Sequence, residues 1–87
     1  MESRTEQLLM LAELSMDAKA MNDAALADDL DEARFRVRLI VARAQEGGLE
    51  LVAEAAEDIA VLLRDSGMEP LPGYGHAMLR LAKVLTP

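Results

Sequence analysis

Strong helix-forming residues dominate this chain and leave little material for a β-sheet. Alanine and leucine each occur fifteen times in 87 residues, whereas there is one Phe, one Tyr and no Trp. Ala, Leu, Met, Glu and Arg favour helices, and the β-branched and aromatic residues that suit a pleated sheet are scarce. The sequence therefore predicts an all-α fold with an aliphatic core.

Apolar periodicity and capping signals divide the chain into four helical segments. Ser3 and Glu6 have capping-box spacing and predict the start of the first helix. The pair Gly47–Gly48 is expected to end the second helix, and Gly67 followed by Met68, packing back on the helix, fits a Schellman motif that ends the third. We expect a small bundle of three longer helices and a short C-terminal one, over residues 4–27, 29–46, 49–66 and 74–85.

The boundary between the first two helices has two candidate positions. Asp29 and Glu32 have the spacing of an N-cap and its third helical residue, which favours a break at 28–29. Asn22 and Asp23 offer an earlier break at 22–23, because the alanine-rich segment between the two positions fits either helix. We predict the later break.

The first predicted helix carries two apolar stripes and is longer than the others. At 1.5 Å per residue it spans roughly 36 Å, against roughly 18 Å for the last helix, which is too short to cover it. Two apolar sides with one incomplete covering layer predict a homodimeric helical bundle in which the uncovered stripe meets its symmetry mate. The residues expected at this dimer interface are Leu9, Met16 and Ala20, with Leu8 and Phe35 nearby.

Charged residues fall into blocks along the chain, and the formal net charge is −7. A segment with four arginines and no acid lies between two acidic segments, which predicts attractive pairs between antiparallel neighbouring helices. A single aromatic residue, Phe35, lies among these arginines, which is too few for a base-stacking platform, and the negative net charge repels nucleic acid. Nucleic-acid binding is therefore not expected of the arginines, which are Arg34, Arg36, Arg38 and Arg43.

The third predicted helix has a row of carboxylates, Glu50, Glu54, Glu57 and Asp58. The segment 54–63 (EAAEDIAVLL) resembles the metal-binding helix of the all-α nucleotide pyrophosphohydrolases, the MazG and phosphoribosyl-ATP pyrophosphatase group. This resemblance implies hydrolysis of a nucleoside triphosphate with Mg²⁺ held by two helices, and the corresponding hypothesis for this chain uses these four carboxylates as metal ligands. That family carries its second acidic motif on the preceding helix, where this chain has arginines. The alternative interpretation of the row is a solvated helix face.

Two other residues resemble known functional groups. His76 could accept a phosphoryl group, as in histidine phosphotransfer modules, but those place the histidine in the middle of a helix, and a histidine at a helix N-terminus is the simpler interpretation. Asp65 and Ser66 resemble the Asp-Ser of acyl carrier proteins, whereas their predicted place at a helix end favours a C-cap. The six methionines either fill the core or form an adaptable binding surface.

These features together favour a binding protein over an enzyme. The chain has no cysteine and a single histidine, so it lacks a thiol nucleophile and the cluster of nitrogen and sulfur ligands that zinc prefers. We predict a small acidic interaction or regulatory protein without a cofactor, whose partner presents a basic surface or an amphipathic helix. A Mg²⁺-dependent nucleotide pyrophosphohydrolase is the alternative. The charged N-terminal segment and the short apolar runs predict a cytoplasmic protein with no membrane span. The excess of arginine over lysine and the abundance of alanine suggest a bacterial source.

Overall fold

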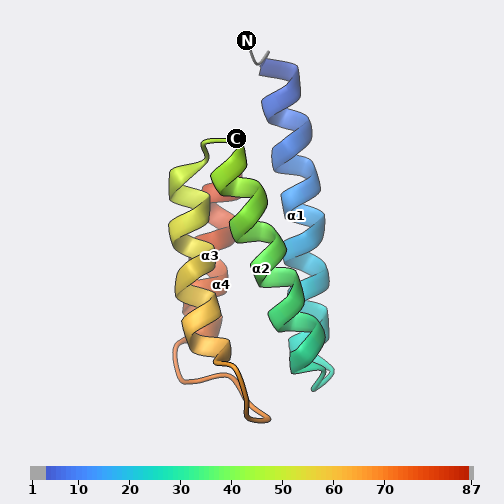
Figure 1. Ribbon diagram of the computed structural model, residues 1–87, viewed down its shortest axis with the longest axis vertical. Coiled ribbons are helices and arrows are strands. Elements are labelled where there is room, and N and C mark those ends of the chain that lie inside the picture. The colour runs from blue at the N-terminus through green and yellow to red at the C-terminus, as the bar shows by residue number, and fades with distance from the viewer. Residues whose placement is uncertain (1–3, 87) are drawn as a thin grey trace.

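Four helices and no strand make up residues 4–86, the part of the chain that the computed structural model describes. They are α1 (Arg4–Leu26), α2 (Leu30–Glu46), α3 (Glu50–Leu63) and α4 (Tyr74–Leu85) (Figure 1). The predicted all-α bundle, with a short helix at its C-terminal end, is confirmed. Ser3 of the predicted capping box lies outside the described residues.

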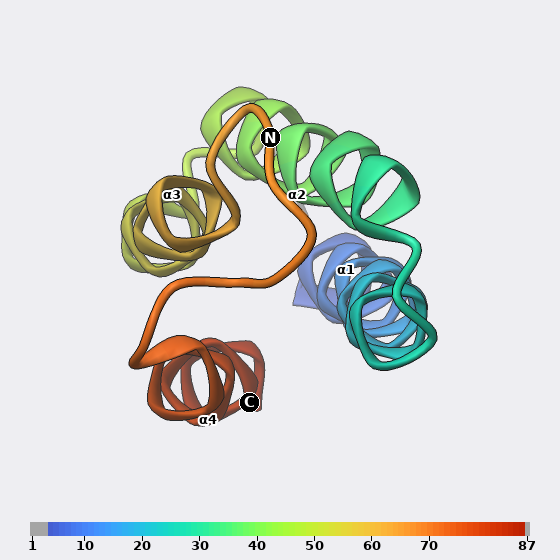
Figure 2. The ribbon, with the colours of Figure 1, turned by 90° about the horizontal axis from the view of Figure 1, so that it is seen from below.

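The helices pack side by side in chain order, and α4 returns to contact α1. Viewed along the bundle, they form a ring around a common core (Figure 2). The molecule measures 42 × 18 × 17 Å, because α1, with 23 residues, extends past the junction of α2 and α3 (Figure 1). Every side chain from residue 4 to residue 9 is exposed, so the first turns of α1 lie outside the bundle.

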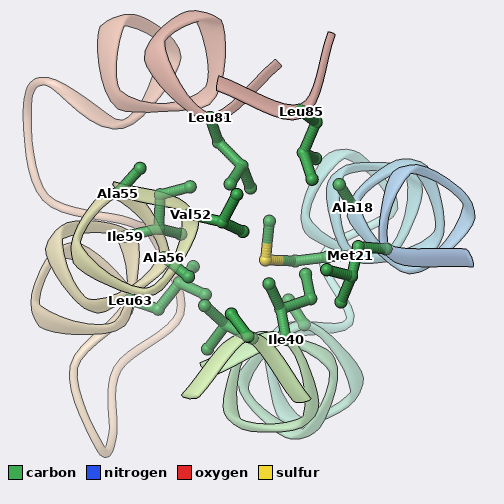
Figure 3. Packing of buried hydrophobic residues seen from close by; sticks show 14 of the residues in the cluster. Ala18, Met21, Ile40, Val52, Ala55, Ala56, Ile59, Leu63, Leu81 and Leu85 are labelled. Carbon is green, nitrogen blue, oxygen red and sulfur yellow. The ribbon is translucent and has the colours of Figure 1, made fainter. Parts of the chain in front are cut away.

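The core is aliphatic, as the composition predicts. All four helices contribute side chains that are fully enclosed, among them Leu14, Ile40, Ile59 and Leu81. Met21 is also fully buried, and its side chain reaches from α1 into the centre of the bundle (Figure 3). A flexible thioether fills an irregular space that no aromatic ring occupies here. At least this methionine therefore serves the core.

The break between α1 and α2 lies at the later of its two candidate positions. Asp28 has a left-handed φ of 63°, and the Asp29 side chain accepts a hydrogen bond of 3.2 Å from the backbone N–H of Glu32. This bond satisfies one of the free N–H groups at the start of α2. The local capping signal in the sequence is thus the one that the chain uses.

The two glycines of the α2–α3 turn lie in different surroundings. Gly48 has a φ of 72°, a conformation that other residues adopt at a cost. At Gly47, a Cβ atom would collide with the side-chain sulfur of Met10, which lies against the turn. The long first helix is therefore anchored to the end of α2 just after its protruding turns.

The predicted C-terminus of the third helix is wrong. The helix ends at Leu63, three residues before Ser66, and Gly67 belongs to the following loop. Met68 is 85% exposed and does not pack back on the helix, so the Schellman motif expected here does not form. Arg64 instead leaves the helix with a positive φ of 58°.

A buried arginine from α2 explains this early end. The Arg34 side chain lies beside the end of α3, where its Nε donates to the carbonyl oxygens of Leu63 at 3.1 Å and Arg64 at 3.0 Å. Its Nη2 donates to the Gly67 carbonyl at 2.9 Å, and its Nη1 donates to Asp31 at 3.2 Å. Arg34 therefore takes the place of a local cap and holds the loop against α2.

The start of α4 is tied to α1 by a hydrogen bond between side chains. The Tyr74 hydroxyl donates to Oδ1 of Asn22 at 3.1 Å, and the ring is half-buried. Burial disfavours the charged phenolate and raises the pKa of Tyr74 above its ordinary value of 10.0.

We expect this raised pKa to make the fold sensitive to alkaline pH. The folded state holds the Tyr74 proton more tightly than the unfolded state, so this contribution to stability is complete below pH 10.0 and is lost as the pH rises through the folded pKa. Tyr74→Phe should cost about 0.5–1.5 kcal/mol at neutral pH and should flatten the alkaline decline. Urea unfolding at a series of pH values measures both effects. Asn22→Ala is the matched control, because it removes the hydrogen bond and keeps the phenol; equal alkaline slopes for Tyr74→Phe and the parent protein would contradict the prediction.

Candidate interaction surface

The outer face of α1 carries large apolar side chains that the bundle does not cover. Leu14 and Met21 point into the core, whereas Leu9 is 60% exposed and Met16 is 73% exposed. Ala20 is partly exposed. The three outer residues share one side of the helix because they are seven and four positions apart. The structure thus brings together Leu9, Met16 and Ala20, the first three residues expected at the dimer interface.

The two flanking residues of that prediction lie on different elements. Leu8 is 42% exposed and belongs to the protruding turns of α1. Phe35 is half-exposed and extends from α2, away from the buried residues Ala33 and Val37. The sequence predicts that Phe35 lies near the dimer interface. The structure places it on α2, the helix next to α1, and does not show it beside Leu9 or Met16.

An ion-pair network fixes α1 against α2 beside this face. Asp17 is buried, and its two carboxylate oxygens lie 2.9 Å from Arg43 Nη1 and 3.4 Å from Arg36 Nη1. Arg36 also lies 3.4 Å from Glu32 on its own helix. This network is the attraction between acidic and basic segments that the charge blocks predict. It fixes the register of the two helices, which sets where the exposed Met16 lies relative to α2.

The carboxylates of α3 do not converge on one point. Glu50, Glu54 and Glu57 are exposed on the outer side of the helix, and Glu57 accepts a hydrogen bond from Gln45 of α2. Asp58 is turned toward α4, where it pairs with Arg80. Within residues 4–86, no three acidic or histidine side chains are grouped closely enough to hold a metal ion. The acidic row has the arrangement of a solvated face.

The remaining candidate residues are separated from one another. His76 is exposed in the first turn of α4, and Ser66 is exposed in the loop after α3, beyond the position where a C-cap would lie. The charge pattern groups Arg34 with the other arginines. In the structure, however, its side chain is only 7% exposed, and its guanidinium donates hydrogen bonds to backbone carbonyl oxygens. Arg38 is exposed, and nothing in the described part of the chain forms an ion pair with it.

Sequence reasoning missed the structural role of Arg34, although the sequence contains a signal for it. Arg34 follows Leu30 by four positions and precedes Val37 by three, so all three lie on the buried side of α2. A charged residue among core positions needs internal partners, because its burial without them costs several kcal/mol. The carbonyl oxygens at the end of α3 are those partners.

None of the helices in the described part of the chain combines the length and the hydropathy needed to cross a membrane. No protein-family model, no curated protein and no solved structure matches this chain.

Proposed function

We propose that this chain is a non-enzymatic interaction protein that forms a homodimer through the outer face of α1 and binds a second protein in the bacterial cytoplasm. The exposure of Leu9 and Met16 on the longest helix carries this proposal. Large apolar residues aligned on one helix face are typical of an association surface.

The total surface supports association. The chain has a mass of 9.5 kDa and exposes 5688 Å² to solvent. A compact monomer of this mass exposes about 5000 Å². The extra exposed surface reflects the elongated shape of the molecule, in which the first turns of α1 have no neighbouring helix. Pairing with a second copy is a common way for a chain of this size to cover such surface.

A two-fold axis near the middle of this face gives a specific pairing. When two copies of α1 cross in antiparallel fashion near Ala12, Leu9 of one copy lies opposite Met16 of the other, and the same contact occurs twice. Ala12 is small, so the two helices can approach closely at the crossing. This arrangement buries Leu9 and Met16 and needs no change in the bundle.

Leu9→Glu and Met16→Glu are expected to convert the dimer into a folded monomer. Because the interface is two-fold symmetric, each substitution occurs in it twice, and each places a carboxylate against apolar surface. Association should therefore weaken by about 100-fold or more. Sedimentation equilibrium measures the mass, and circular dichroism checks that the helices persist. Leu79→Glu is the matched control, because Leu79 is 71% exposed on α4, away from this face. A parent protein that sediments as a monomer at high micromolar concentration would contradict the dimer.

A further inference from the structure

A groove with an apolar floor follows the outer side of the α2–α3 pair. Its volume is about 390 Å³, and the apolar side chains that line it are Val41, Ala42, Ala60 and Val61. Val61, in the last turn of α3, is 70% exposed. Val41 and Ala60 pack against the core below. The small side chains at this place leave space for another helix to approach the two helices closely.

The groove has charges of opposite sign at its two ends. Arg38 lies at one end, exposed and without an ion pair among residues 4–86. Toward the α2–α3 turn lies a second depression of about 440 Å³, which shares Gln45 and Glu57 with the groove and is also lined by Glu50 and Glu54. These two carboxylates are also exposed and have no ion-pair partner in the described residues. The hydrogen bond from Gln45 to Glu57 joins the two helices where the depressions adjoin.

We propose that this groove binds an amphipathic helix of a partner protein. The inference rests on the proposed function in one respect, that the partner is a protein. The partner helix has an apolar stripe that covers Val61, an acidic residue that meets Arg38, and lysine or arginine residues that meet Glu50 and Glu54. Charge complementarity fixes which end of the partner helix lies at the α2–α3 turn.

The dimensions fit a short helical segment. Glu50 and Val61 are eleven residues apart on α3, which corresponds to about 16 Å along the helix axis and to about three turns of a partner helix. The carboxylates at one end repel a phosphate backbone, so a nucleic acid does not fit this groove. The residues that line the groove belong to α2 and α3, and α3 lies across the bundle from α1 (Figure 2). A homodimer through α1 would therefore leave two such grooves free.

A displayed library of amphipathic helices tests the groove directly. The library has a fixed leucine stripe and randomised residues at both ends, and it is selected against the full chain. The expected binders carry acidic residues at one end and basic residues at the other. Val61→Asp should weaken their binding by about tenfold or more, because it places an unpaired carboxylate against the apolar stripe. Arg38→Glu should weaken binding by about fivefold, as expected for a charge at the rim of an interface.

Leu79→Asp is the matched control for Val61→Asp, because the two side chains are equally exposed and both lie within helices. It should leave binding unchanged. Failure to select any binder, or binders that respond equally to Val61→Asp and Leu79→Asp, would overturn the proposal. Sedimentation of the same variants separates this result from the dimer. Val61→Asp should remain dimeric, and Met16→Glu should still bind the selected helices as a monomer.

Discussion

Replacing Arg34 with alanine is expected to destabilise the fold by about 1–3 kcal/mol, the cost of leaving buried hydrogen-bond acceptors without a donor. The substitution leaves the carbonyl oxygens of Leu63, Arg64 and Gly67 without their donors at the end of α3. It also opens a space between α2 and the loop. Because a domain of this size has a total stability at the low end of about 5–15 kcal/mol, the loss should be evident. Urea unfolding followed by circular dichroism measures it.

Two further variants separate the capping role from charge alone. Arg34→Lys keeps the positive charge but replaces a planar group with several donors by one compact ammonium, so we expect an intermediate loss. Arg38→Ala removes an exposed arginine from the same helix and should change stability by less than about 0.5 kcal/mol. If Arg34→Ala and Arg38→Ala have equal effects, the contacts of Arg34 with the loop do not contribute to stability.

The sequence was sufficient to predict the fold class and most of the helical segments. Helix-forming composition and apolar periodicity act through local backbone preferences and through burial of one helix side, and both are visible in a single sequence. The start of α2 is predictable for the same reason, because Asp29 caps a residue only three positions away. Signals of this kind need no knowledge of tertiary structure.

The end of α3 could not be predicted by the same reasoning. A local rule places the helix end at Gly67, whereas the cap is supplied by Arg34, which is 29 positions before Leu63. Contacts at this separation depend on how α2 and α3 pack, and the spacing of residues in either helix does not contain that information. Tertiary hydrogen bonds thus override a local stop signal here.

The candidate surfaces depend on packing to different degrees. The two stripes of α1 are predictable from spacing, but both are apolar, and only the packed bundle shows that Leu14 is enclosed and Met16 exposed. The α2–α3 groove combines Arg38 and Val41 of one helix with Val61 of the next. Their proximity follows from the register of an antiparallel pair, so neither helix alone indicates a groove.

The second large effect is expected at Leu81, since α4 has only two buried residues, Leu81 and Leu85. The Leu81 side chain points toward the core side of α3, near Val52 (Figure 3). Leu81→Ala should cost about 2–5 kcal/mol, because it removes buried methyl groups and leaves a cavity. The exposed pair of Arg80 with Asp58 contributes at most about 1 kcal/mol and cannot replace this packing. Urea unfolding measures the total loss.

Leu79→Ala provides a control in the same helix, with the same chemical change at a side chain that is 71% exposed. It should alter stability by less than about 0.5 kcal/mol. Hydrogen exchange should locate the effect of Leu81→Ala, because α4 contacts the bundle through fewer buried side chains than any other helix among residues 4–86. Amides of α4 should then exchange by local opening, while those of α2 and α3 still require global unfolding. Equal loss of protection in all four helices would show instead that α4 unfolds only together with the rest of the bundle.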